Sequence, residues 1–412
     1  MARTNKRKYD VVLYGATGFT GKLVADYLAK AYGATGDLKW ALGGRSEAKL
    51  EAVRADLVKR WPDAATLPLV VADSRDPASL TAMAKLAKVV CTTVGPYAKY
   101  GSELVAACAA EGTDTCDLTG ETQWVRRMVD EHHAVAAASG ARIVNCCGFD
   151  SIPSDLGTLV LQEHAIAQHG QPVKDVTLYV WKMKGTASGG TIDTARTTIA
   201  AVKQDPSLRK ILGNPYACNP EGERSGPDGG DLNWAKFDPA IGRWVGPFVM
   251  ASTNTRIVRR SNALLGYRYG KDFRYREVTR FSKGLRGRLE AMAMAGALGG
   301  LLVGLATPLT RPILDRLLPD PGEGPSPETI EAGFFDMRIK GSIGGKDLTV
   351  KVRGERDPGY GATAIMLGEA AVCLAKDRTA LPKAAGVLTP ATGMGMVLVE
   401  RLRAAGMTFE VM

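Results

Sequence analysis

The chain has 412 residues, of which 45% are hydrophobic, and its formal net charge at pH 7 is +10. This length accommodates two domains with substantial cores. The seven cysteines include no CxxC pair, which excludes a disulfide framework, predicts no metal site and favours a reducing compartment. Because the basic residues before Tyr9 lead directly into an apolar strand without a signal-like region, we expect a cytoplasmic protein.

The first chemical feature is a glycine-rich turn that follows the apolar run Tyr9–Tyr14 and opens an apolar-periodic helix. Its spacing is GxxGxxG rather than the commoner GxGxxG. Such a turn lets a backbone approach a pyrophosphate at a helix N-terminus, where free N–H groups and the helix dipole favour an anion. A tight turn without a ligand is the alternative. The candidate cofactor-binding residues of this turn are Gly15, Thr17, Gly18, Phe19, Thr20 and Gly21.

The end of the second predicted strand, Leu38–Gly43, indicates which dinucleotide is bound. NAD enzymes usually place an acidic residue there to hold the ribose hydroxyls, whereas this chain continues with Arg45 and Ser46. A guanidinium and a hydroxyl can both bind a 2′-phosphate, so NADPH is favoured over NADH. In the alternative interpretation, Arg45 merely caps a surface turn before the next helix.

Later strand ends supply the remaining candidates of the nucleotide site. Asp73 follows the third strand, where this fold often contacts adenine, and Gly95, Pro96 and Tyr97 follow the fourth, near the expected nicotinamide. Tyr97 and Tyr100 are candidate catalytic residues because a phenol can donate a proton or polarise a carbonyl. Packing against the cofactor is the alternative role for both.

Strands and helices alternate over residues 1–150, which predicts an α/β fold with a Rossmann-type doubly wound parallel sheet. Residues 151–359 change periodicity and predict a second α+β domain for substrate binding or oligomerisation. Asp150 and Ser151 lie at the junction, and we expect them to face the crevice as further catalytic candidates. The sequence does not determine the number of subunits, and a homodimer is one option.

Positive charge is concentrated in the segment from Arg256 to Arg288, where eleven Lys or Arg residues stand against Asp272 and Glu277. Residues 291–310, which follow, contain no charged residue and carry three glycines at intervals of four. Three interpretations remain open for this apolar segment: a peripheral membrane contact through residues 256–310, a buried or subunit-interface helix, and a membrane span. No nucleic-acid-binding module accompanies the charge, so we expect no nucleic-acid partner.

Seven stretches, spread in order over nearly the whole chain, resemble the saccharopine dehydrogenase-like family, and within it the bacterial trans-acting enoyl reductases. These stretches are Tyr14–Gly21, Gly43–Ser46, Val94–Tyr97, Asp117–Glu121, Gly148–Asp155, Thr255–Ser261 and Gly386–Pro390.

The resemblance implies an oxidoreductase that uses NADPH to reduce the double bond of a polyketide or lipid-like enoyl thioester for a partner synthase. It also implies that residues 360–412 pack back to complete the nucleotide domain. Two alternatives remain: a saccharopine-type amino-acid dehydrogenase, in which Arg256, Arg259 and Arg260 would bind substrate carboxylates, and a non-catalytic NADP-binding scaffold at a membrane.

Overall fold

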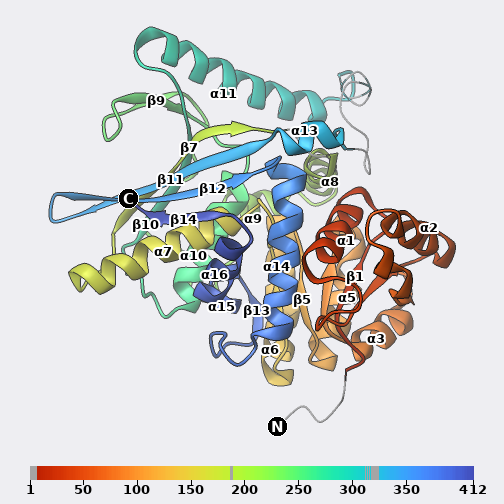
Figure 1. Cartoon of the computed structure of the whole chain (residues 1–412). Helices are drawn as coiled ribbons and strands as arrows, with labels where there is room; N and C mark the ends of the chain where they lie inside the picture. Colours follow the sequence, from red (N-terminus) through yellow and green to blue (C-terminus); the bar gives the residue numbers. More distant parts are fainter. Residues whose placement is uncertain (1–6, 186–188, 311, 313, 315, 317–323) are drawn as a thin grey trace. The chain divides into compact units, whose positions relative to one another are not determined.

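The computed structural model describes residues 7–185, 189–310, 312, 314, 316 and 324–412. The chain forms two compact units (Figure 1). The first unit contains residues 1–119, 127–149 and 360–405, and the second contains residues 120–126, 150–359 and 406–412.

The first unit is built on a seven-stranded sheet in which every pairing is parallel. Its central strand buries all six residues, as expected when helices cover both faces of a sheet. In sheet order the strands are β13 (Gly386–Leu388), β6 (Arg142–Val144), β5 (Asp114–Cys116), β4 (Ala87–Thr92), β1 (Tyr9–Tyr14), β2 (Trp40–Gly44) and β3 (Leu69–Val71).

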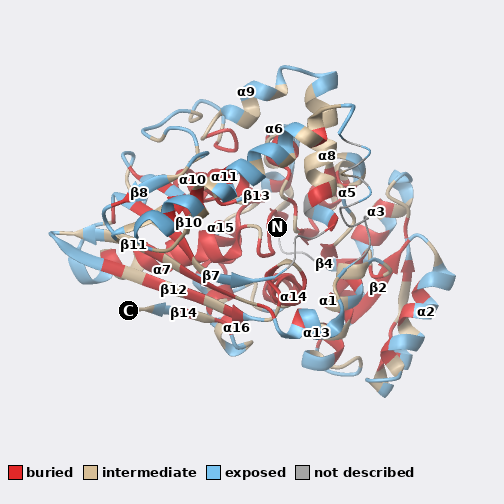
Figure 2. Ribbon diagram, turned by 90° about the horizontal axis from the view of Figure 1, so that it is seen from above, coloured by how far each residue is buried: buried red, intermediate tan, exposed pale blue. Residues whose placement is uncertain are grey.

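Helices pack on both faces of this sheet. Figure 2 shows α1 and α14 on one side, with α3 and α5 on the other. The helices of the first unit are α1 (Phe19–Tyr32), α2 (Glu47–Val58), η1 (Pro62–Thr66), α3 (Pro77–Leu86), α4 (Tyr97–Tyr100), α5 (Ser102–Glu111), α6 (Thr122–Ser139, which begins in the second unit), η2 (Pro358–Ala362), α14 (Thr363–Lys376), α15 (Pro390–Gly393) and α16 (Gly395–Ala404). The predicted Rossmann-type parallel sheet is therefore confirmed.

The second unit contains a mixed seven-stranded sheet in which only β7 and β10 pair in parallel. In sheet order the strands are β14 (Thr408–Val411), β12 (Lys346–Glu355), β11 (Phe334–Ile343), β7 (Asp175–Lys184), β10 (Arg274–Arg280), β9 (Arg243–Gly246) and β8 (Lys236–Asp238). The predicted hairpin is formed by β11 and β12. Its two turn residues, Gly344 and Gly345, have φ of 56° and 80°, which suits the tight turns that join antiparallel strands.

Helices α7 (Ile152–His169) and α10 (Ala251–Leu264) pack against this sheet and against each other. Gly157 permits the approach of α7, because a Cβ there would lie 2.2 Å from Ile339 Cδ1. The remaining helices of the second unit are α8 (Gly189–Gln204), α9 (Leu208–Gly213), α11 (Gly284–Ala306) and α13 (Pro327–Glu331).

One predicted boundary is corrected by the strand pairing. We expected residues 360–412 to complete the nucleotide domain, but β14 pairs antiparallel with β12, so residues 406–412 belong to the second unit. The helices of this segment end at Ala404, and the short strand β14 that follows is stabilised by pairing with the edge of the second sheet.

Candidate functional site

The glycine-rich turn joins β1 to α1 at the carboxyl edge of the first sheet. Gly15 has φ of 94°, and a Cβ at Gly21 would lie 2.1 Å from the Gly15 carbonyl oxygen. Gly18 is the exposed N-cap residue of α1, no side chain caps this helix end, and its first turn contains no acidic residue. The N–H groups of a first helical turn have no intrahelical acceptor, so this turn fits a phosphate group.

Thr17, Phe19 and Thr20 are the remaining candidate residues of this turn. Thr17 lies over the end of β2, with its Cγ2 3.7 Å from where a Cβ on Gly44 would be. The ring of Phe19 meets the edge of Tyr360, with centroids 4.9 Å apart. Thr20 is partly exposed in the first turn of α1.

Arg45 is exposed immediately after β2 and forms no ion pair with any residue that the structure describes. Ser46 is the N-cap of α2, and its hydroxyl oxygen accepts from the Lys49 N–H at 3.4 Å. The capping role that we considered as an alternative therefore belongs to Ser46, whereas the guanidinium of Arg45 has no ion-pair or hydrogen-bond partner in the part of the chain that the structure describes. An uncompensated cation at this strand end fits a 2′-phosphate.

The loop after β4 is tied to the glycine-rich turn, since Thr93 Oγ1 donates to the Gly15 carbonyl at 3.1 Å. Gly95 is exposed and Pro96 is partly exposed in this loop. Tyr97 is 4% exposed, and its hydroxyl donates to the Thr92 carbonyl at 3.1 Å and accepts from the Leu118 N–H at 3.3 Å. The tyrosine hydroxyl thus joins the end of β4 to the segment that follows β5, which gives these two hydrogen bonds a structural role.

Two other candidates lie beside these strands. Asp73 accepts from the Arg75 N–H at 2.9 Å in the turn after β3. Burial, reinforced by the Asp73 charge, raises the pKa of Tyr14 to about 12. The Tyr100 ring is partly exposed and lies beneath the Arg75 guanidinium, 6.0 Å from its centroid.

The sequence analysis missed a buried carboxyl at the same edge. Asp117 is 2% exposed and accepts from Asn145 Nδ2 at 2.6 Å and from the Thr119 and Cys146 N–H groups, both at 3.0 Å. Burial raises its pKa to about 6, although these three hydrogen bonds lower it. Asn145 is fully buried, and its Oδ1 has no hydrogen-bond partner in the described structure.

Within the second unit, Ser151 is fully buried and does not line an open surface. Its hydroxyl donates to Asn254 Oδ1 at 3.0 Å, while Asn254 Nδ2 donates to Ser154 Oγ at 3.1 Å and to Glu277 Oε2 at 3.0 Å. The expectation that Ser151 faces a crevice is therefore wrong. Asp150 is only partly buried and lies next to Gly120.

Glu277 was not identified from the sequence either. Burial raises the pKa of Glu277 to about 7, although its hydrogen-bond donors lower it. One of these donors is Tyr275, whose hydroxyl donates to Oε1 at 2.8 Å. Alternation in β10 indicates that Glu277 points to the opposite side from Arg276, but only the packing of α7 and α10 buries it.

The arginines of α10 are structural. Arg259 Nε donates to Asp228 Oδ2 at 2.7 Å, Arg256 pairs with Asp231, and Arg260 donates to the Cys218 carbonyl. All three arginines are at most 3% exposed. These arginines of the basic segment therefore bind carboxylates and carbonyl oxygens of the protein itself, whereas we expected the segment to meet an anion.

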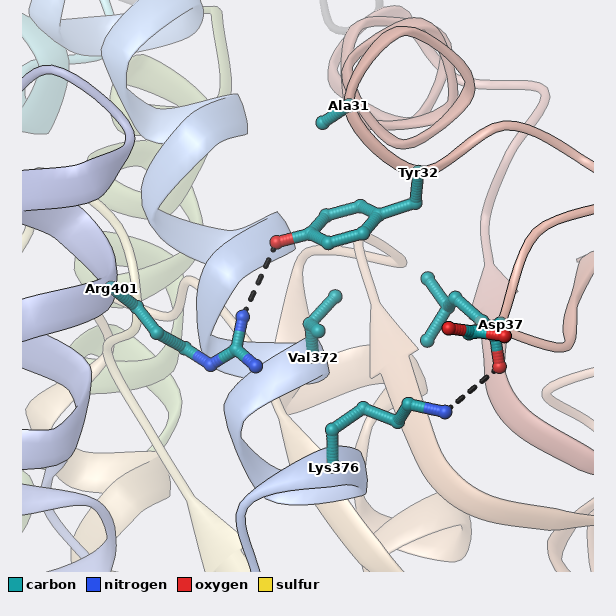
Figure 3. Close-up of a pocket in the computed structure, with 7 residues that line it drawn as sticks. Ala31, Tyr32, Asp37, Val372, Lys376 and Arg401 are labelled. Atoms are coloured by element: carbon teal, nitrogen blue, oxygen red, sulfur yellow. Dashed lines mark hydrogen bonds between the residues drawn. The ribbon is translucent and has the colours of Figure 1, made fainter.

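A pocket of about 340 Å³ lies at the other edge of the first sheet, near the end of α1 and the start of β2 (Figure 3). Its two cations are engaged: Lys376 donates to the Asp37 carbonyl at 2.8 Å, and Arg401 lies 3.2 Å from Glu369 Oε2. Because the glycine-rich turn and Arg45 lie at the carboxyl edge, this pocket is separate from the candidate nucleotide site.

A parallel Rossmann-type sheet with an uncapped glycine-rich turn defines a protein of the dinucleotide-binding class. A solved structure with a related fold is an apo saccharopine dehydrogenase (L-Glu forming) from Saccharomyces cerevisiae, with a TM-score of 0.53 and 16% identity over 98% of this chain and 99% of that chain. This likeness establishes a saccharopine dehydrogenase-like fold. No protein-family model matches the chain.

Full-length relatives identify the family. Trans-acting enoyl reductases of Mycobacterium tuberculosis and Mycobacterium bovis are 39% identical over 97% of this chain and 97% of the relative. The trans-acting enoyl reductase of Mycobacterium leprae is 38% identical over 98% and 97%, respectively. Another Mycobacterium tuberculosis protein, provisionally named as a trans-acting enoyl reductase, is 42% identical over the same shares. The chain belongs to the trans-acting enoyl reductase family of oxidoreductases.

Proposed function

We propose that the protein is an NADPH-dependent enoyl reductase that acts on a polyketide or lipid-like enoyl thioester, in association with a synthase. The observation that carries the cofactor assignment is Arg45, an exposed guanidinium without an ion-pair partner among the described residues, at the strand end where NAD enzymes place a carboxylate. The names of the mycobacterial relatives support reduction of an enoyl group. The polyketide or lipid-like thioester and the synthase are part of the proposal and rest on the family resemblance of the sequence.

The residues at the carboxyl edge fit a nicotinamide dinucleotide. The uncapped first turn of α1 would hold the pyrophosphate, and Arg45 with Ser46 would bind the 2′-phosphate. Asp117 holds the Asn145 amide by accepting from Nδ2, which leaves Oδ1 free to accept from a carboxamide. When bound, the reduced cofactor supplies the hydride that adds to the β-carbon of the enoyl thioester.

The chain's own contribution to the reaction is orientation and desolvation. Tyr97 holds the ends of β4 and β5 together through two backbone hydrogen bonds, which fixes the edge on which the nicotinamide would lie. The α-carbon would then take up a proton, for which we propose solvent water as the source. A preorganised site that polarises the thioester carbonyl does not require a dedicated base in this chain.

The saccharopine-type alternative loses its structural motivation. It requires arginines that are free to bind substrate carboxylates, whereas Arg256, Arg259 and Arg260 are buried and bonded within the second unit. An isolated carboxylate ligand could not displace these contacts without leaving buried groups unpaired.

The experiment has two arms with purified protein. One follows the oxidation of NADPH or NADH with an α,β-unsaturated acyl thioester, and the other follows the reduction of NADP⁺ with saccharopine. We expect turnover with NADPH and the enoyl thioester. Turnover with saccharopine would support the amino-acid dehydrogenase. Saturable NADPH binding without turnover of either substrate would support the non-catalytic scaffold.

A further inference from the structure

The outer side of α11 is an apolar surface that no other described element covers. Its residues are mostly exposed, as the pale blue and tan parts of Figure 2 show. The helix is long and apolar enough to cross a membrane, with a mean hydropathy of 1.7 over an 18-residue stretch. Only 17% of that stretch is buried. The large apolar side chains exposed on α11 and just after it are Leu285, Leu289, Met294, Leu302, Val303 and Leu309.

This composition is unusual for a helix at a protein surface. A helix of a water-soluble unit normally presents charged or polar residues on its outer face. From residue 291 to residue 310 the chain has no charged residue, and the glycines at 296, 299 and 300 have no atom within 4 Å of where a Cβ would be. Water is therefore a poor solvent for this face, and an apolar medium would cover it favourably.

The opposite side of α11 is held over the first half of the helix and again near its end. Gly287, Ala291, Ala295 and Leu305 are buried, and the helix packs against β9 and α8 of the same unit. A transmembrane orientation would break these contacts at both ends of the helix. The helix is thus positioned to lie along a surface, over a length of about 35 Å at 1.5 Å per residue.

Cations gather around the start of this helix. Lys283 is exposed and has no ion-pair partner among the described residues, Arg288 lies over the Trp244 ring at 5.5 Å, and Arg286 is 83% exposed although paired with Glu290. The adjacent strand β8 adds the exposed Lys236 and the half-exposed ring of Phe237. Cations and an aromatic ring beside an apolar helix match the headgroup region of an anionic bilayer.

We propose that α11 is a monotopic membrane contact, which lies flat in the surface of an anionic lipid bilayer with Lys283, Arg286 and Arg288 at the phosphate groups. A contact between α11 and the α11 of a second copy would leave Lys283 and Arg288 without complementary charge, because the only carboxylate of the helix is Glu290 and it is already paired. The inference concerns where the protein resides and does not depend on the proposed reaction.

The test is flotation of the full chain with vesicles of phosphatidylcholine alone or with one third phosphatidylglycerol. We expect binding to the anionic vesicles. The double variant L302Q/V303Q should bind at least about tenfold more weakly, since both side chains are more than half exposed and unfolding is not expected. The matched control is V135Q on α6, where Val135 is 46% exposed, and it should bind like the wild type.

The charge component is tested by K283E, with K346E at the exposed first residue of β12 as its control. We expect K283E to weaken binding to anionic vesicles by roughly 30-fold, because each cation near such a surface contributes about 1 kcal/mol and a charge reversal doubles that change. Equal binding of the wild type to neutral and anionic vesicles would overturn the assignment to an anionic surface. Absence of vesicle binding would overturn the membrane contact itself. This includes the outcome in which the wild type binds no vesicles but forms a dimer that L302Q/V303Q converts to a monomer.

Discussion

Two regions of the molecule are rich in polar residues: the carboxyl edge of the first sheet, and the surroundings of α7 and α10 in the second unit. They differ in whether these polar groups have partners within the protein. At the edge, the N-terminus of α1 has no side-chain cap and Arg45 has no ion-pair partner among the described residues. Between α7 and α10, Asn254 is bonded to Ser151, Ser154 and Glu277, and Arg259 is bonded to Asp228.

The difference separates binding groups from folding groups. A buried polar group that is bonded within the protein stabilises a particular packing, whereas a group left without a partner is available to a ligand. The number of arginines in a segment does not distinguish the two cases. The three arginines of α10 are buried and bonded within the protein, whereas the single Arg45 is exposed and available to a ligand.

The largest expected effect comes from breaking a buried ion pair of the second unit. Asp228→Ala leaves the Arg259 guanidinium, whose side chain is 2% exposed, without its carboxylate. We expect the free energy of unfolding to fall by about 3–5 kcal/mol, measured by urea denaturation. Asp347→Ala, which removes a 72% exposed carboxylate, should change it by less than about 1 kcal/mol. Equal effects of the two variants would contradict a structural role for the α10 arginines.

The next effect concerns Glu277. Because burial raises its folded-state pKa from 4.5 to about 7, its ionisation opposes folding: the stability is full below pH 4.5 and is lost as the pH rises to 7. This loss amounts to about 3 kcal/mol. In Glu277→Gln, denaturation measured at pH 5 and pH 8 should lack this fall, whereas Glu400→Gln, at an exposed site, should retain it. Parallel pH profiles for wild type and Glu277→Gln would rule out the raised pKa.

A smaller effect is expected at the open edge, where no folding contact is lost. Arg45→Ala should weaken NADPH binding by roughly 30-fold, or about 2 kcal/mol for charge-assisted hydrogen bonds, and leave NADH within twofold. Titration of both cofactors by fluorescence measures this difference. Lys30→Ala, an exposed cation at the far end of α1, serves as the control. Equal weakening of both cofactors would refute a contact with the 2′-phosphate.

The smallest effect tests whether Tyr97 belongs to the fold or to the chemistry. Tyr97→Phe removes a hydroxyl bonded to Thr92 and Leu118, so stability should fall by about 1 kcal/mol while kcat changes less than tenfold. The matched variant Tyr100→Phe should leave stability unchanged. A drop in kcat of two or more orders of magnitude for Tyr97→Phe would instead identify a proton donor.

Local patterns predicted much of the first unit. The Gly15–Gly21 turn, the strand ends that carry Arg45 and Asp73, and the parallel sheet follow from short-range rules of apolar runs, glycine spacing and helix starts. The β11–β12 hairpin likewise follows from alternation on either side of Gly344 and Gly345. In these cases the residues that determine the structure are close together in the chain.

The misassigned residues depend on contacts between distant segments. Ser151 is buried because Asn254, more than a hundred residues later, packs against it. Residues 406–412 join the second sheet because β12 offers an unpaired edge, and the pKa of Asp117 depends on Asn145 and Cys146. No pattern within one segment reports such partners.

By itself the sequence determined the class of fold, the glycine-rich turn and the absence of charge in residues 291–310, because each is encoded by neighbouring residues. The tertiary structure alone decided which polar groups are already bonded, and that α11 exposes its apolar face while α10 buries its arginines. Burial and hydrogen bonding depend on which elements pack together, and long-range packing sets that arrangement.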